Sequence, residues 1–175
     1  MIERTKKWIS LKLLKRQLKR KSVEQSNFNN FIKNSKKFLL ILPDDKVNWD
    51  FLMPTFDFLL KSEKELSLFF PENQLGSIPL KQKFSSITYN EVDVSRFNLP
   101  DKSLTDKLGN HTFDVVIDLN TKENIFYSAV ANLVKSDFRI GFIKKDSDLY
   151  YNFQIPSEIN NEISYRNLLN SLTMF

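Results

Sequence analysis

Carboxylates that follow apolar runs are the residues of this sequence best placed for chemistry. Asp44 and Asp45 follow the run Lys37–Leu42 after a single proline, Pro43, and Asp118 stands near the end of the run Phe113–Leu119. Paired carboxylates can share a proton or bind Mg²⁺, and a carboxylate at the end of a parallel strand can contact a ligand. These positions are therefore the first candidates for a site.

A structural role competes with a functional one at each carboxylate. The chain has three Gly, and they form no phosphate-binding loop. Asp44 and Asp45 are therefore expected in a solvated loop. For Asp118 we favour an N-terminal cap, on a helix that starts near Lys122, over a ligand contact.

Composition excludes several classes of catalytic site. The chain has no Cys, which excludes disulfides, thiol nucleophiles and cysteine-ligated metals. Its one histidine, His111, lies in a predicted turn, so no metal or other cofactor is expected. Arg139 has two interpretations, contact with a phosphate or acid of a ligand and a local pair with Asp137, and the second is favoured.

A strand–helix–strand unit positions Asp118 and Arg139. The run Phe113–Leu119 is apolar and β-branched, which suits a strand buried on both faces. Ile125, Ala129 and Leu133 follow at helical spacing, and Arg139–Ile143 is a second strand. This pattern predicts a right-handed βαβ unit in a parallel sheet.

The remaining elements alternate in the same way. Further strands are predicted at Lys37–Leu42, Leu66–Phe70, Ser86–Tyr89 and Tyr151–Ile155. Helices are predicted over Phe51–Leu60 (with Pro54 in the first turn), Pro100–Leu108 and Ile163–Phe175, and a loop over 71–84. The pattern predicts an α/β fold: one Rossmann-like domain with a doubly wound, mostly parallel sheet.

A basic extension precedes this domain. Residues 1–22 contain nine Lys or Arg against one Glu, and their composition favours a helix. The predicted division is a basic helix with its linker over 1–35 and the domain over 36–175. The helix could pack on the domain or on a second copy, lie on an anionic membrane, or bind RNA through Lys15, Arg16, Lys19 and Arg20. No apolar run is long enough to span a bilayer and no secretory signal is evident, so the expected location is the cytoplasm, including the inner face of the membrane.

Several segments together resemble the amino-terminal acceptor domain of glycosyltransferase family 9, the ADP-heptose:lipopolysaccharide heptosyltransferases. The segment Phe38–Leu60 follows the family's first strand, S-x-x-G-D loop and Pro-containing helix. Asp114–Thr121 resembles its D-V-V-I-D-L-Q-G strand, and Arg139–Phe142 matches its R-I-G-F strand. Leu149–Asn152 and Tyr165–Leu169 resemble its L-Y-N strand and its last helix motif, so the likeness covers residues 37–175.

The resemblance implies an inverting, metal-independent transferase whose base is an Asp after the first strand. That position falls on Asn48, whose amide cannot accept a proton at neutral pH. Asp50, after a one-residue gap, or Asp45 is the alternative base. The family's ligand-facing Gln-Gly is replaced by Asn120 and Thr121. Ligand contacts are therefore expected at four positions, which are Asn48, Asp118, Asn120 and Arg139.

These departures favour a non-catalytic binding or scaffold module derived from such an acceptor domain, a pseudoenzyme. The chain ends where the linker to a donor domain would begin, so one alternative is the acceptor half of a split glycosyltransferase. This half would act in cell-envelope polysaccharide synthesis with a separate donor-domain protein. A second alternative is RNA, ribosome or membrane-surface binding through the basic helix. A homo-oligomer is a further expected partner state.

Overall fold

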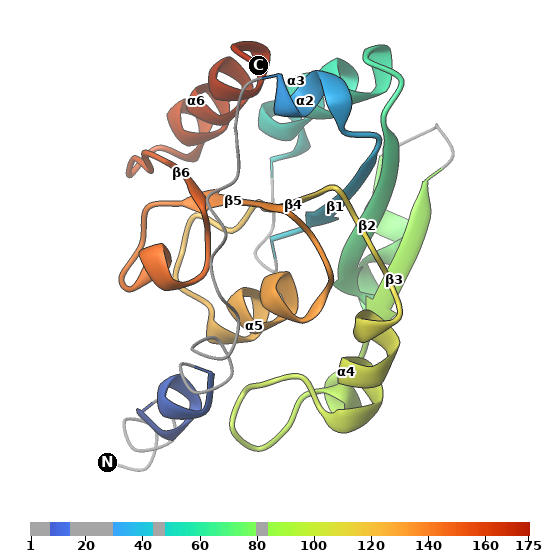
Figure 1. Cartoon of the computed structure of the whole chain (residues 1–175), viewed down its shortest axis with the longest axis vertical. Helices are drawn as coiled ribbons and strands as arrows, with labels where there is room; N and C mark the ends of the chain where they lie inside the picture. The colour runs from blue at the N-terminus through green and yellow to red at the C-terminus, as the bar shows by residue number, and fades with distance from the viewer. Residues whose placement is uncertain (1–7, 15–29, 44–47, 80–83) are drawn as a thin grey trace.

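A six-stranded parallel sheet forms the centre of the molecule (Figure 1). The computed structural model describes residues 8–14, 30–43, 48–79 and 84–175. The strand order is β3-β2-β1-β4-β5-β6, the order of a doubly wound Rossmann-like sheet. The strands are β1 (Lys37–Ile41), β2 (Glu65–Pro71), β3 (Ser85–Tyr89), β4 (Val115–Asp118), β5 (Phe138–Phe142) and β6 (Phe153–Ile155). The predicted fold class is confirmed.

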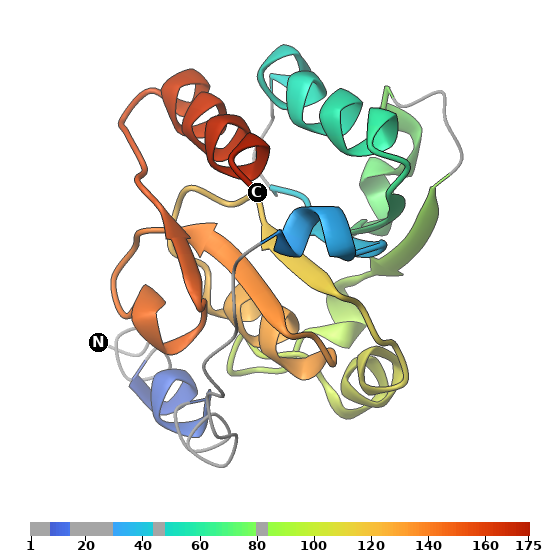
Figure 2. The ribbon, with the colours of Figure 1, turned by 45° about the horizontal axis from the view of Figure 1, so that its top comes forward.

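Helices cover both faces of the sheet (Figure 2). The α-helices are α2 (Phe31–Asn34), α3 (Trp49–Lys61), α4 (Lys102–Gly109), α5 (Ile125–Leu133) and α6 (Asn161–Thr173). Short 3-10 turns are η1 (Glu72–Ser77), η2 (Glu91–Asp93) and η3 (Ser147–Leu149), so the predicted loop 71–84 contains one of them. Among the described helices, none is long and apolar enough to cross a membrane.

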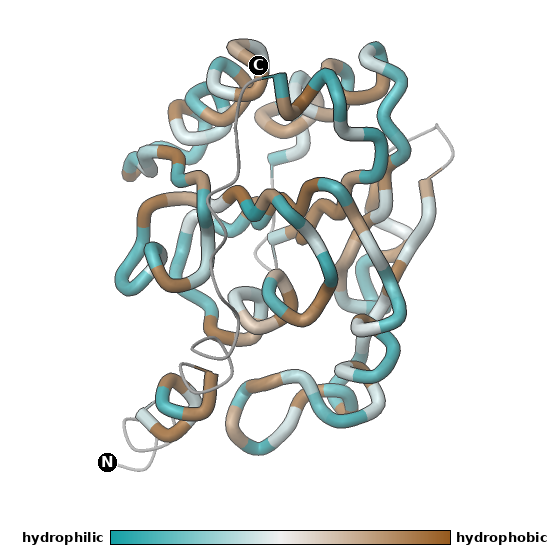
Figure 3. The backbone as a smooth tube through the Cα atoms, viewed as in Figure 1, coloured by the Kyte–Doolittle hydropathy of each residue, from teal (hydrophilic) through white to brown (hydrophobic). Residues whose placement is uncertain are grey.

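Alternation along the buried strands divides the core into two layers. Phe38 and Leu40 of β1 pack with α2, α3 and α6, whereas Leu39 and Ile41 pack with α4 and α5. Because both faces are covered, β1 and β4 are apolar almost throughout, as Figure 3 shows along the central strands. Asp118 falls on the α5 side, two residues after Val116.

Asparagine and aspartate side chains set where four of the helices begin. The caps are Asn48 for α3, Asp101 for α4, Asn124 for α5 and Asn160 for α6. The prediction that Asp118 caps α5 is therefore wrong, because the helix starts three residues later than expected and has its own Asn124.

Pro54 lies inside α3 and not in its first turn, because the Asn48 cap starts the helix at Trp49. A proline at this depth cannot donate to the carbonyl oxygen of Asp50. Both residues are solvent-exposed, so water can satisfy that carbonyl.

The amino-terminal extension is described over two stretches only. Residues 8–14 are helical, as predicted, and the rest of the predicted helix lies outside the described residues. Part of the predicted linker, residues 31–34, instead forms α2, whose Phe31 and Ile32 are buried in the core. The core thus begins earlier than residue 36.

Candidate functional site

The sheet reverses its winding between β1 and β4, and ligands of open α/β sheets bind at the carboxyl ends of the strands at such a point. Ile41 pairs with Asp118 in the register of these two strands. The loop after β1 and the loop after β4 therefore leave the sheet side by side, and Asp118 stands between them and the neighbouring strand β5.

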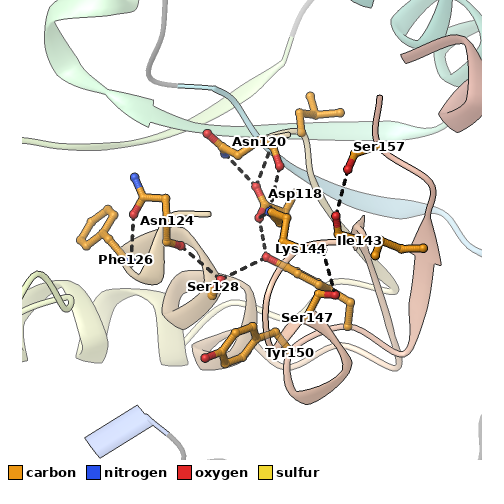
Figure 4. A network of polar contacts seen from close by, with 12 residues as sticks. Asp118, Asn120, Asn124, Phe126, Ser128, Ile143, Lys144, Ser147, Tyr150 and Ser157 are labelled. Atoms are coloured by element: carbon orange, nitrogen blue, oxygen red, sulfur yellow. Dashed lines mark hydrogen bonds and ion pairs between the residues drawn. The ribbon is translucent and has the colours of Figure 1, made fainter. Parts of the chain in front are cut away.

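Four hydrogen bonds surround the Asp118 carboxylate (Figure 4). Its Oδ1 accepts from the backbone N of Asn120 at 3.1 Å and from the Asn120 side chain Nδ2 at 2.7 Å. Its Oδ2 accepts from Lys144 Nζ at 2.9 Å and from the Tyr151 hydroxyl. A carboxylate offers about four lone-pair positions, so this one is fully used.

Burial makes these contacts energetically important. Asp118 is 1% exposed, and the Lys144 side chain is nearly as buried. Lys144 Nζ also donates to the Asn120 carbonyl oxygen at 2.8 Å and lies 5.2 Å from the centre of the Tyr151 ring. Burial, and next the charge of Asp118, raise the pKa of Tyr151, so its hydroxyl stays protonated and donates. We call Asp118, Asn120, Lys144 and Tyr151 the polar clamp.

Gly141 of β5 gives the Tyr151 ring its place in the clamp. A Cβ at this position would lie 2.7 Å from three atoms of the ring. The glycine of the Arg139–Phe142 segment is thus explained by packing.

The clamp joins three segments that are distant in sequence. It fixes the turn after β4 to the turn after β5, and Asn120 Nδ2 also lies 3.4 Å from the Leu42 carbonyl oxygen, after β1. Ser128 of α5 extends the network, with its Oγ 3.3 Å from the Tyr151 hydroxyl. The arrangement therefore joins the chain after β1, β4 and β5 at one edge of the sheet.

A second polar region lies at the carboxyl ends of β2 and β3. A hollow of about 560 Å³ opens there. It is lined by Pro71, Glu72, Asn73, Tyr89, Asn90, Glu91 and Val94. The Tyr89 ring stacks on Phe69 with centroids 5.0 Å apart, and its hydroxyl is 2.7 Å from that of Tyr127. The hollow thus combines a fixed aromatic wall with two solvent-exposed carboxylates.

Comparison with known proteins gives one result. The model of a family of unknown function, DUF6913, matches residues 6–171. The chain belongs to DUF6913. No curated protein and no solved structure matches it.

Two of the residues that were predicted to act at the first loop, Asn48 and Asp50, lie together at the start of α3 in the DUF6913 domain. Asn48 is exposed, and its Oδ1 accepts from the backbone N of Asp50 at 3.1 Å, which makes it the cap of α3. Asp50 is exposed in the first turn of α3. Asp44 and Asp45 lie outside the described residues, as do Lys15, Arg16, Lys19 and Arg20. The proposed roles of these residues stay predictions.

Arg139 of the DUF6913 domain lies away from the clamp. Its Nε donates to the Ala131 carbonyl oxygen at 3.0 Å and an Nη to that of Val134 at 3.3 Å, at the carboxyl end of α5. Burial lowers the pKa of this guanidinium, and the charge of Asp137 acts in the opposite direction. Because α5 runs back along the parallel strands, its carboxyl end lies at the opposite edge of the sheet from Asp118. Arg139 therefore stabilises the last turn of a helix, and the structure does not bring it together with the other predicted ligand contacts.

The clamp partners Lys144 and Tyr151 and the hollow were missed by sequence reasoning. Lys144 stands in a charged turn that reads as solvated, and the hollow lies partly in a segment predicted as a plain loop. A usable signal existed, because polar residues that follow neighbouring parallel strands meet at one edge.

Among the described residues, no group of three acidic or histidine side chains could hold a metal ion.

Proposed function

We propose that this chain is a non-catalytic binding or scaffold module built on the acceptor-domain plan of glycosyltransferase family 9. The observation that carries the proposal is the Asp118 carboxylate at the switch point. It is buried, and all its acceptor positions are used within the chain. A carboxylate in this state holds loops together and offers no free acceptor position to a ligand.

The position expected for a catalytic base also supports a non-catalytic role. A general base must lie within hydrogen-bond distance of the proton that it removes and must be able to accept it. The side chain of Asn48 is an amide, and its oxygen is engaged as the cap of α3. Its local role is therefore accounted for without a reaction.

The hollow beside β2 and β3 is the place where we expect a small ligand. Its volume falls in the range of about 300–1,000 Å³ typical of ligand pockets. Glu72, Glu91 and the amide of Asn73 can accept hydrogen bonds from the hydroxyl or amino groups of a polar molecule. The Oδ1 of Asn90 caps η2, so this side chain can offer its Nδ2 as a donor. The ring of Tyr89 offers an apolar surface beside them.

Two measurements test this proposal together. The purified chain should transfer no sugar from nucleotide-sugar donors to glycan acceptors. In a screen of polar small molecules by NMR, ligands should shift the resonances of Tyr89 and Asn90. Glu91→Gln should weaken the binding of these ligands and so reduce the chemical-shift changes. Measured transfer by the chain alone, or binders that all map elsewhere, would overturn it.

The acceptor half of a split transferase is the second candidate, and the placement of Asp50 favours it. This carboxylate is exposed at the start of α3, where the chain returns from the carboxyl end of β1. Material co-purified with a donor-domain partner should then transfer sugar, and Asp50→Asn should abolish the reaction. Asp57→Asn is the matched control, since Asp57 is exposed further along the same helix. If the co-purified material is inactive, this candidate fails.

A further inference from the structure

One face of the helical segment 8–14 is fixed to the domain. Leu14 is 2% exposed and belongs to the core layer of α4 and α5. Ser10 is equally buried, and its Oγ donates to the Phe97 carbonyl oxygen in the segment that leads to α4. These two contacts set which side of the segment faces outward.

The outward side carries apolar side chains beside a cation. The exposed fraction is 60% for Trp8 and 40% for Leu13. Lys12 is also exposed, and around the helix axis it lies between these two residues. At about 100° per residue, the three positions span an arc of about 140°. Lys12 Nζ lies 4.9 Å from the centre of the Trp8 ring. An exposed Trp close to a Lys is typical of segments at the boundary between water and lipid.

The positive charge of the amino-terminal segment indicates which kind of surface its outward side can bind. The first 22 residues carry nine Lys or Arg and one Glu, and four of these cations (Lys15, Arg16, Lys19, Arg20) follow Leu14 within six residues. Each basic residue close to an anionic leaflet contributes about 1 kcal/mol. We propose that the amino-terminal segment docks the domain on an anionic lipid surface, with Trp8 and Leu13 entering the headgroup region.

Lipid fits this face better than RNA phosphates do. Phosphate binding needs the cations alone and leaves Leu13 without a role. One face of the Trp8 ring is already occupied by Lys12, which reduces the ring surface available for stacking on a base. The inference is independent of the ligand proposed at the hollow.

The experiment uses the whole 175-residue chain and vesicles of two compositions. One is phosphatidylcholine alone, and the other is phosphatidylcholine mixed with phosphatidylglycerol. In a Trp49→Phe background Trp8 is the single tryptophan, so its emission should shift to the blue only with the anionic vesicles. The protein should also co-sediment with them and be released by salt, because exposed charges are screened.

Two variants and one control complete the test. Replacing Lys15, Arg16, Lys19 and Arg20 by Gln should weaken vesicle binding at least about 100-fold, from four lost contributions. Trp8→Ala should weaken it less and leave its salt dependence unchanged. The control replaces four exposed lysines elsewhere (Lys33, Lys61, Lys102 and Lys145) by Gln and should bind like the parent.

Three results would overturn the proposal. They are equal binding to both vesicle types, equal loss in the control variant, and binding of labelled single-stranded RNA without any vesicle binding.

Discussion

Two groups of polar residues lie at the carboxyl edge of one sheet, and they differ in how far their charges are satisfied. In the polar clamp, after β4 and β5, a buried carboxylate accepts four hydrogen bonds from within the chain. In the hollow, after β2 and β3, Glu72 and Glu91 are exposed and line open space. A carboxylate at a strand end is thus not a site by position alone. Burial and the number of its donors decide whether it stabilises the fold or can meet a ligand.

Removal of the clamp's charge should have the largest effect. Asp118→Asn leaves Lys144 buried without a counter-charge, so the free energy of unfolding should fall by about 3–5 kcal/mol. Urea denaturation followed by circular dichroism measures the loss. Glu91→Gln in the hollow is the matched control, and its effect should stay within about 0.5 kcal/mol.

A variant that does not fold would leave this comparison open, so a second variant accompanies it. Asp118→Asn combined with Lys144→Met removes both buried charges and keeps a side-chain oxygen that can accept from Asn120 or Tyr151, so this variant should recover part of the stability that Asp118→Asn loses. Equal small losses for Asp118→Asn and Glu91→Gln would show that burial does not distinguish the two regions.

The hydroxyl of Tyr151 should give the next largest effect. Tyr151→Phe removes a donor to a charged group, and the expected loss in the free energy of unfolding is about 1.5–3 kcal/mol. Tyr89→Phe in the hollow removes a hydroxyl that pairs with the neutral Tyr127, for which about 0.5–1.5 kcal/mol is expected. The ratio of the two losses, measured by urea denaturation, tests the comparison. A larger loss for Tyr89→Phe would contradict it.

Gly141 tests the packing that places the Tyr151 ring. Gly141→Ala would put a Cβ 2.7 Å from the ring, and the resulting overpacking should lower the free energy of unfolding by about 1–3 kcal/mol. Gly109→Ala, where no atom lies within 4 Å of the added Cβ, should be neutral or stabilising by about 0.4–1 kcal/mol. Thermal melts of both variants measure this difference. Similar melting temperatures would mean that the ring moves aside without cost.

The fold could be predicted because its strands are buried on both faces. Apolar, β-branched runs such as Phe113–Leu119 identify such strands without long-range information. Boundaries were less accurate where a cap decided them, as at Trp49 and Ile125, since an Asn one position away moves the start of a helix.

The candidate site could be predicted only in part. Asp118 was identified as a candidate from its place at a strand end, but its burial and its hydrogen bonds within the chain were not predicted. Lys144 and Tyr151 lie 26 and 33 residues away in sequence, and the parallel pairing of β4 with β5 brings them close. Neither residue type reveals burial by itself, and Lys144 stands in a turn rich in charge. The sequence therefore did not show how deeply this turn is buried, because the packing of the folded chain determines it.

Tyr150 sharpens the contrast from inside the same segment, and its substitution should have the smallest effect near neutral pH. Its buried hydroxyl has no hydrogen-bond partner among the described residues, so Tyr150→Phe should be neutral or slightly stabilising there. Burial, and then Asp146, Glu123 and Asp148, raise the pKa of Tyr150 to about 12 in the folded chain, against about 10 when unfolded. A raised folded pKa favours the folded state at low pH, and this contribution is lost as the pH rises from about 10 to about 12. Urea denaturation across this range should therefore show a steeper loss of stability for the parent than for Tyr150→Phe. Parallel pH profiles would show that Tyr150 is hydrated in the folded chain.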